Sequence, residues 1–153
     1  MQPILENEHY SATCQFCKII RSQANSQIVY EDQDTLAFLD TRPLFPGHTL
    51  LVPRWHIPTL AELPDQLIEP FFKNARLLAV AVEGAMLADG TFVAINNKVS
   101  QSVPHLHIHI VPRRKGDGMK GFFWPRHSYR DQQELFQVQA LIRSEISRIQ
   151  AGK

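Results

Sequence analysis

One short segment, HLHIHIV at residues 105–111, alternates histidine with leucine or isoleucine. Successive side chains of a β-strand point to opposite faces of the sheet, so every second residue shares a face. The segment therefore predicts a strand whose apolar side chains pack into a core while its imidazoles form one polar row on the other face. That row consists of His105, His107 and His109.

The composition limits the class of protein. The chain has 153 residues, of which 44% are hydrophobic and 20% charged, which is typical of one globular domain with its own core. A net charge of +1 gives no broad basic field, so we expect neither nucleic acid nor a membrane as a partner. The N-terminus lacks the apolar stretch of a signal peptide and no window reaches transmembrane length, so we expect a cytoplasmic protein.

Hydrophobic periodicity and turn residues predict the order of the elements. The expected helices are a short one that opens near Thr13, one at 62–90 and one at 131–150, and the expected strands lie at 27–32, 35–40, 49–53, 91–96 and 105–111. The strands pair early and do not alternate with helices. This order favours an α+β fold with a mainly antiparallel five-stranded sheet, a long helix packed on it and a C-terminal helix.

Two chemistries suit a row of imidazoles on a strand. A pair of histidines two residues apart can hold a catalytic zinc or copper ion. However, barrel hydrolases that use such pairs need roughly 200 residues or more, and this chain is shorter. Alternatively, a neutral imidazole can attack phosphorus while its neighbours fix its tautomer and handle protons. A rigid strand holds the attacking nitrogen in line with its target.

Three segments resemble the histidine-triad (HIT) family, including its bacterial members. They are QSVPHLHIHIVPR at 101–113, FLDTRPLFPGHTLLVPRWHI at 38–57 and CQFCKIIRSQANSQIVYEDQDTLAFLD at 14–40. The resemblance covers residues 14–125 as one domain within 1–153, with 1–12 as an N-terminal extension and 129–150 as a C-terminal helix. It implies a nucleotide hydrolase or transferase that cleaves nucleoside phosphoramidates or dinucleoside polyphosphates at the α-phosphorus through a nucleotidyl-histidine. The alternative is a nucleotide-binding signalling module with slow or incidental catalysis.

The resemblance also implies roles for individual residues. His107 is the expected nucleophile, His109 contacts the phosphate or bridging atom, His48 orients the triad, and Ser102 serves the leaving group, as in the phosphoramidase-like (Hint) branch. Asp40 is expected to bind the ribose hydroxyls of a purine nucleotide or dinucleotide. The remaining expected nucleotide-binding residues are Phe16, Ile19, Phe38 and Leu39 around the base, and Asn96, Asn97 and Gln101 near the phosphate.

Two features of the chain are less clear from the resemblance. The family usually has glycine immediately before Gln101, where this chain has Ser100, and the loop before it is shorter. The basic, aromatic segment 113–127 could be a lid that contacts a second phosphate or nucleoside through Arg113, Arg114 or Trp124. It could equally be a solvated basic loop whose aromatic residues pack on the protein.

The resemblance further implies a structural zinc ion and a homodimer, and no organic cofactor. Cys14 and Cys17 are half of a tetrahedral zinc site, which on its own could also be two small buried side chains of a helix. His56 and His105 would complete the set, so that His105 faces the metal and His107 the phosphorus. The pairing elements of the dimer would be helix 70–88 and strand 91–96, since the apolar residues of the helix cover a wide arc.

Overall fold

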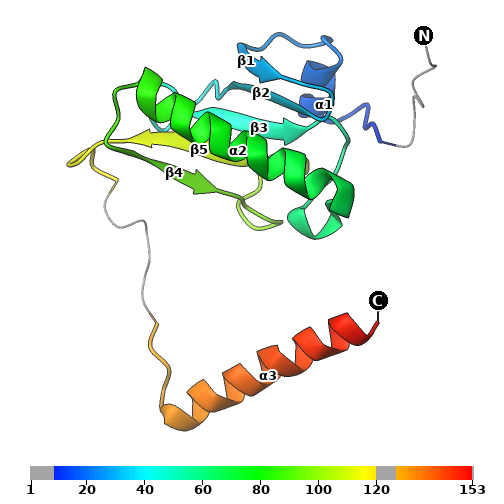
Figure 1. Cartoon of the computed structure of the whole chain (residues 1–153), viewed down its shortest axis with the longest axis vertical. Coiled ribbons are helices and arrows are strands. Elements are labelled where there is room, and N and C mark those ends of the chain that lie inside the picture. Colours follow the sequence, from blue (N-terminus) through cyan, green and yellow to red (C-terminus); the bar gives the residue numbers. More distant parts are fainter. Residues whose placement is uncertain (1–8, 120–126, 153) are drawn as a thin grey trace. The chain divides into compact units, whose positions relative to one another are not determined.

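The structure is a computed structural model that describes residues 9–119 and 127–152 (Figure 1). The chain divides into two compact units, Met1–Asp117 and Gly118–Lys153. The helices are α1 (Gln15–Ile20), the 3₁₀ helix η1 (Leu60–Glu62), α2 (Asp65–Ala85) and α3 (Gln132–Ala151). The strands are β1 (Ile28–Glu31), β2 (Thr35–Leu39), β3 (Thr49–Pro53), β4 (Gly90–Ala94) and β5 (Ile108–Arg113).

The first unit is built on one five-stranded sheet with the strand order β1-β2-β3-β5-β4. Each neighbouring pair in this order is antiparallel. The predicted α+β fold, with its antiparallel sheet and long helix, is therefore confirmed. The expected order of helices and strands is also confirmed along the part of the chain that the structure describes.

Helix α2 covers one face of the sheet and lies in front of β3 and β5 in Figure 1. Its buried apolar residues recur at helical spacing and meet odd-numbered residues of β2 and β3 together with even-numbered residues of β5. They are Leu67, Phe71, Ala75, Leu78 and Val82. Two further apolar residues of α2, Ile68 and Phe72, lie outside this stripe and are 44% and 42% exposed.

The opposite face of the sheet packs against α1. The short helix buries Phe16, Cys17 and Ile19 against the even-numbered residues of β2 and β3. Because side chains alternate along a strand, this face receives the residues that α2 does not contact. The sheet therefore separates a mainly apolar layer under α2 from a layer under α1 that also holds histidines and cysteines.

The histidine segment differs from its predicted bounds. Strand β5 begins at Ile108, so His105 and His107 precede the strand, and the expected strand 105–111 is wrong at both ends. Before Ile108, the backbone carbonyl of His105 accepts a hydrogen bond from the imidazole of His107 and not from a neighbouring strand. The alternation of faces nevertheless persists, because Leu106, Ile108 and Ile110 are at most 1% exposed.

The second unit contains α3. Asp131 caps the helix by accepting a hydrogen bond from the backbone N–H of Glu134, whose own carboxylate accepts one from the backbone N–H of Arg130. None of the described residues of α3 is buried. Among the helices of residues 9–119 and 127–152, none combines the length and apolar character that a membrane crossing requires.

The turn that leads into β3 requires glycine at position 47. Its φ of +96° lies in the left-handed region, and a Cβ built there would stand 2.6 Å from Cγ of Met86 and 3.3 Å from Cγ of Pro112. We predict that Gly47→Ala lowers the free energy of unfolding by about 1–3 kcal/mol, measured by urea denaturation. Gly84→Ala is the control, since a Cβ at this α2 position meets no atom within 4 Å. A Gly47→Ala protein as stable as the control would contradict the prediction.

Candidate active site

A cavity of about 260 Å³ opens on the α1 side of the sheet. It brings together eight of the residues expected to bind the nucleotide or act on it. They are Phe16, Ile19, Phe38, Leu39, Asp40, Ser102, His107 and His109. The rings of Phe16 and Phe38 meet edge to face with centroids 5.3 Å apart, which gives this end of the cavity aromatic walls.

His107 is held in one tautomer. Its side chain is 3% exposed, and its Nδ1–H donates to the backbone carbonyl oxygen of His105 at 2.7 Å. A carbonyl oxygen only accepts hydrogen bonds, so the proton of the neutral ring is on Nδ1. The lone pair is therefore on Nε2. Since the residue lines the cavity, this places a nucleophilic nitrogen at the site.

His48 and His109 form a directed chain of hydrogen bonds. The backbone N–H of Leu44 donates to Nδ1 of His48 at 3.1 Å, so the proton of His48 is on Nε2. This Nε2–H donates to Nδ1 of His109 at 3.0 Å. The remaining nitrogen of His109, Nε2, then carries a proton and is the donor that this ring can offer to a ligand in the cavity.

The same burial keeps these rings neutral. Burial, followed by the proximity of His107 and His48, lowers the pKa of His109 from 6.5 to about 4. Burial also lowers the pKa of His48, although the carboxylate of Asp40 opposes this shift. The His48 and His109 rings are consequently uncharged near neutral pH, and their N–H groups act as dipoles.

Asp40 is fixed at the cavity by its own turn. Its Oδ1 accepts a hydrogen bond from the backbone N–H of Arg42 at 2.8 Å, and its Oδ2 lies 3.7 Å from Nδ1 of His48. The carboxylate keeps acceptor capacity for hydroxyl groups, because each oxygen can accept two hydrogen bonds.

The amides expected near the phosphate are engaged within their own loop. Asn96 donates to the carbonyl of Ser100 at 3.3 Å, and Asn97 accepts from the backbone N–H of Leu60 at 2.9 Å. Gln101 donates to the carbonyl of Pro58 at 2.6 Å and accepts from the backbone N–H of Lys98. These bonds hold the loop in shape and join it to residues 58–60.

The backbone of Ser100 adopts a conformation that glycine would favour. Its φ of 58° lies in the left-handed region, as does the φ of 68° at Lys98. This region favours glycine, so the usual glycine is replaced here by a residue that must adopt a strained backbone conformation.

Sequence reasoning missed part of the cavity wall. Residues 25 and 26 become neighbours of Asp40 because the backbone N–H of Leu39 donates to Gln27. Only strand register could have revealed this contact. The cavity residues that were not expected are Gln15, Asn25, Ser26, Thr41, Arg42, Leu50 and Val103.

A second group of side chains fits a metal ion. The ligand atoms of Cys14, Cys17, His56 and His105 all lie within 4.8 Å of one another. Nδ1 of His105 is 3.4 Å from Sγ of Cys14 and 3.7 Å from Sγ of Cys17, and Nδ1 of His56 is 3.4 Å from Sγ of Cys17. Two thiols and two imidazoles at the corners of so small a space are a donor set that suits tetrahedral zinc.

The surroundings of this group favour metal binding. Nε2–H of His105 donates to the carbonyl of Pro53 at 2.9 Å, so the lone pair on Nδ1 points toward the sulfur atoms. Burial raises the pKa of Cys17 to about 11, while a backbone hydrogen bond from Ser11 opposes this shift. A cation bound beside Cys17 would favour ionisation of this thiol.

Asp40, His48 and His109 also have ligand atoms within 4.8 Å of one another. Their hydrogen bonds do not suit a metal. Nδ1 of His48 already accepts from the backbone, and its Nε2 donates to the nitrogen of His109 that faces it. The two histidines of this cluster are therefore better described as a chain of hydrogen bonds with fixed direction.

The basic segment after β5 is tied to the protein where the structure describes it. Arg113 makes two hydrogen bonds to Asp117, at 2.6 and 2.9 Å. Arg114 donates to the carbonyl groups of Leu87 and Met86 at the end of α2. Arg113 thus closes the turn that follows β5, and Arg114 joins this turn to the end of α2. Trp124 lies outside the described residues.

Comparison with known proteins identifies the family of this chain. The family model described as HIT domain matches residues 21–116. Protein hit of Bacillus subtilis is 41% identical over 123 residues, covering 78% of this chain and 84% of the relative. Adenylylsulfatase HINT3 of Arabidopsis thaliana is 34% identical and covers 91% and 72% of the two chains. Adenosine 5'-monophosphoramidase HNT1 of Saccharomyces cerevisiae is 37% identical and covers 74% and 71%.

Solved structures lead to the same family. A HIT family member from Bacillus subtilis superposes with a TM-score of 0.79 at 35% identity, covering 86% of this chain and 96% of that one. A zinc-bound histidine triad family protein from Mycobacterium smegmatis gives a TM-score of 0.67 at 30% identity, with 92% and 98% covered. An antiparallel sheet that carries a histidine triad defines a class of proteins, and this chain belongs to the HIT family within it.

The lowered pKa of His109 predicts acid sensitivity. Because the native ring stays neutral down to about pH 4, only the unfolded chain takes up this proton as the pH falls below 6.5. The free energy of unfolding should therefore decrease with falling pH, by on the order of 3 kcal/mol from this residue across the window. Urea denaturation at a series of pH values measures the slope.

His109→Gln should flatten that slope, because the glutamine cannot titrate and its oxygen can still accept from His48. His127→Gln, at an exposed histidine of the second unit, should keep the wild-type slope. Equal slopes in His109→Gln and wild type would show that His109 does not titrate as the geometry requires.

Proposed function

We propose that this chain is a nucleotide hydrolase or transferase that cleaves nucleoside phosphoramidates or dinucleoside polyphosphates at the α-phosphorus. The observation that carries the proposal is the hydrogen bond from Nδ1–H of His107 to the carbonyl of His105, which leaves Nε2 free at the cavity. The relatives named adenylylsulfatase and adenosine 5'-monophosphoramidase support an adenylyl group as the transferred part.

In the first step, Nε2 of His107 attacks the α-phosphorus and forms a P–N bond. The bond from phosphorus to the leaving nitrogen or oxygen breaks, and the leaving group departs with its electron pair. Ser102 lines the cavity and supplies a hydroxyl that can donate a proton to that group. The product of this step is a nucleotidyl-imidazolium, in which Nδ1–H still donates to the backbone.

In the second step, water attacks phosphorus and the P–N bond breaks. The nucleoside monophosphate leaves, a proton of the attacking water passes back to the oxygen of Ser102, and His107 returns to its neutral tautomer. Nε2–H of His109 is positioned to donate to a phosphate oxygen, where negative charge increases in both transition states. His48 fixes the direction of this donor.

The alternative is a nucleotide-binding signalling module whose catalysis is slow or incidental. Engagement of Asn96, Asn97 and Gln101 within their loop favours this alternative, because it reduces the number of side chains free to contact phosphate. Turnover of a fluorogenic adenosine phosphoramidate, measured beside a dinucleoside polyphosphate, separates the two functions and the two substrates.

The proposal includes one structural zinc ion per chain, held by Cys14, Cys17, His56 and His105. The closeness of the four donors and the direction of the His105 lone pair support it, as does the zinc-bound relative. When bound, zinc would crosslink α1, the segment after β3 and the start of the histidine segment. With four protein ligands it has no open position, so the chemistry above does not involve it.

The proposal also includes a homodimer that pairs through α2 and β4. These elements expose apolar side chains although α2 already buries a full stripe on its own sheet. Clustered exposed apolar groups on a soluble protein mark an interface. The exposed residues are Ile68, Phe72, Leu77, Val80 and Val93.

His107→Ala should reduce turnover by roughly 10⁴-fold or more, because it removes the atom that forms the covalent bond. His109→Ala should cost roughly 10²–10³-fold, as expected for the loss of one preorganised donor. Both rates are measured on the phosphoramidate and the polyphosphate, with nucleotide binding by calorimetry as the check on folding.

Mass spectrometry of enzyme quenched during turnover should find a nucleoside monophosphate on the peptide that contains His107. An adduct on His109, or a His107→Ala protein with near-normal turnover, would rule out the mechanism.

Light scattering should give twice the chain mass for the wild type at micromolar concentration. Phe72→Glu should shift the mass toward a monomer, because a charge would be buried without a partner at the interface. Val29→Glu is the control, since it introduces the same charge at an exposed apolar residue of β1, the opposite edge of the sheet. A wild-type monomer would contradict the dimer.

A further inference from the structure

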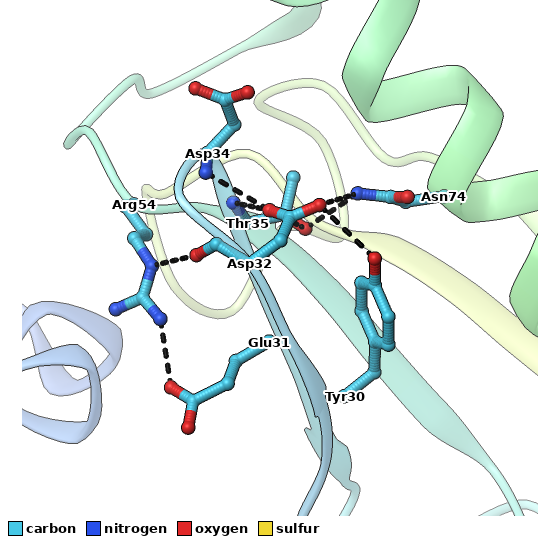
Figure 2. Close-up of polar contacts among 7 residues, drawn as sticks. All are labelled: Tyr30, Glu31, Asp32, Asp34, Thr35, Arg54 and Asn74. Atoms are coloured by element: carbon cyan, nitrogen blue, oxygen red, sulfur yellow. Dashed lines mark hydrogen bonds and ion pairs between the residues drawn. The ribbon is translucent and has the colours of Figure 1, made fainter.

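The turn between β1 and β2 carries a polar network on the α2 side of the sheet (Figure 2). Oδ1 of Asp32 accepts hydrogen bonds from the backbone N–H groups of Asp34 and Thr35, at 2.9 and 2.8 Å, and from the Thr35 hydroxyl at 3.1 Å. Oδ2 accepts from Nδ2 of Asn74 at 2.6 Å and from the hydroxyl of Tyr30 at 3.2 Å. One carboxylate therefore organises the turn.

Asn74 is the α2 partner of this turn and is only 8% exposed. Its amide group donates to Oδ2 of Asp32 and also to the Thr35 hydroxyl at 2.9 Å. Burial would raise the pKa of Asp32, but the hydrogen bonds from Asn74, Asp34 and Thr35 outweigh it and hold the pKa below its ordinary value. The ionised carboxylate is thus the form that the network stabilises.

The backbone of the same turn holds Arg54, just after β3 (Figure 2). Nε of Arg54 donates to the carbonyl of Asp32 at 2.6 Å, and its backbone N–H donates to the carbonyl of Asp34 at 2.8 Å. Its guanidinium also pairs with Glu31 at 2.8 Å. The position of Arg54 consequently depends on the conformation that Asp32 gives to the turn.

Arg54 lies in the chain between Pro53, whose carbonyl orients His105, and His56, a proposed metal ligand. The residue before it, Pro53, pairs with Thr35 across the strands, and its carbonyl accepts the hydrogen bond that orients His105. Two residues after it, His56 points Nδ1 at the sulfur of Cys17. The turn therefore controls the approach of two of the four metal ligands, although it contacts none of them directly.

We infer that Asp32 and Asn74 are positioning residues for the metal site, linking α2 to the two histidine ligands through Pro53 and Arg54. This inference rests on the zinc ion of the proposed function. Outer partners that orient ligands alter metal affinity by roughly 10–100-fold when they are removed. Here the orienting group is the end of β3, and the network of Figure 2 fixes that end.

The test uses the full chain purified without chelator. Elemental analysis gives the zinc content, and transfer of zinc to a chromogenic chelator gives the release rate. Asp32→Asn places two amide groups face to face, and Asn74→Asp places two carboxyl groups face to face. Each single variant should release zinc roughly tenfold faster than the wild type.

The double variant Asp32→Asn with Asn74→Asp restores complementarity. The amide oxygen at position 32 can still accept from the turn, and its N–H can donate to the carboxylate at position 74. Its release rate should return to within about twofold of the wild type, since a coupled pair is non-additive. Such rescue would show that the contact between positions 32 and 74 itself sets the release rate.

Val82→Ala is the matched control, because it removes buried volume from the same helix two turns beyond Asn74. It should lower the melting temperature and leave the release rate within about twofold of the wild type. Release rates that follow melting temperature in every variant, or single variants that release at the wild-type rate, would overturn the inference. A wild type without zinc would instead refute the zinc proposal, and this inference with it.

Discussion

Two backbone carbonyl groups, those of Pro53 and His105, decide how the alternating histidines of this chain can act. Each carbonyl accepts a hydrogen bond from one imidazole and so fixes the proton of that ring on one nitrogen. His105 therefore turns its lone pair toward the cysteines, and His107 turns its lone pair into the cavity. A free imidazole exchanges between both tautomers, so the histidine sequence alone could not make this division. The backbone separates one motif into a candidate ligand and a candidate nucleophile.

Burial keeps the imidazole rings of His48 and His109 neutral. His48 and His109 lose their ordinary basicity because they are desolvated beside other imidazoles. Protonation of His109 would remove the nitrogen that accepts from His48, and protonation of His48 would remove the nitrogen that accepts from Leu44, since a protonated ring has no acceptor nitrogen. The chain of donors from Leu44 to His109 is thus stable only while both rings are neutral. The two rings can consequently offer a ligand in the cavity an oriented dipole rather than a positive charge.

The sequence predicts the order of the elements because each has its own periodicity, whereas the contacts between them are less visible. The predicted bounds of the last strand, 105–111, were wrong. His105 and His107 precede β5, and the imidazole of His107 bonds to the backbone of His105. An asparagine in the long helix reads as a surface residue, yet Asn74 is buried against Asp32. The histidines and cysteines stand in local motifs and could be found. Leu44 and Pro53 act through backbone atoms, which no side-chain pattern reveals.

The loop before the histidines shows what replaces glycine in this chain. Lys98 and Ser100 adopt left-handed conformations that cost free energy, and the loop persists because other groups hold it there. The amides of Asn97 and Gln101 supply that hold by bonding to backbone of the loop and of residues 58–60. An amide that maintains the loop loses its bonds if it turns to a ligand. Under the proposed function, the N–H of His109 and the hydroxyl of Ser102, whose residues line the cavity, are therefore better suited than these amides to meet the charge of a phosphate.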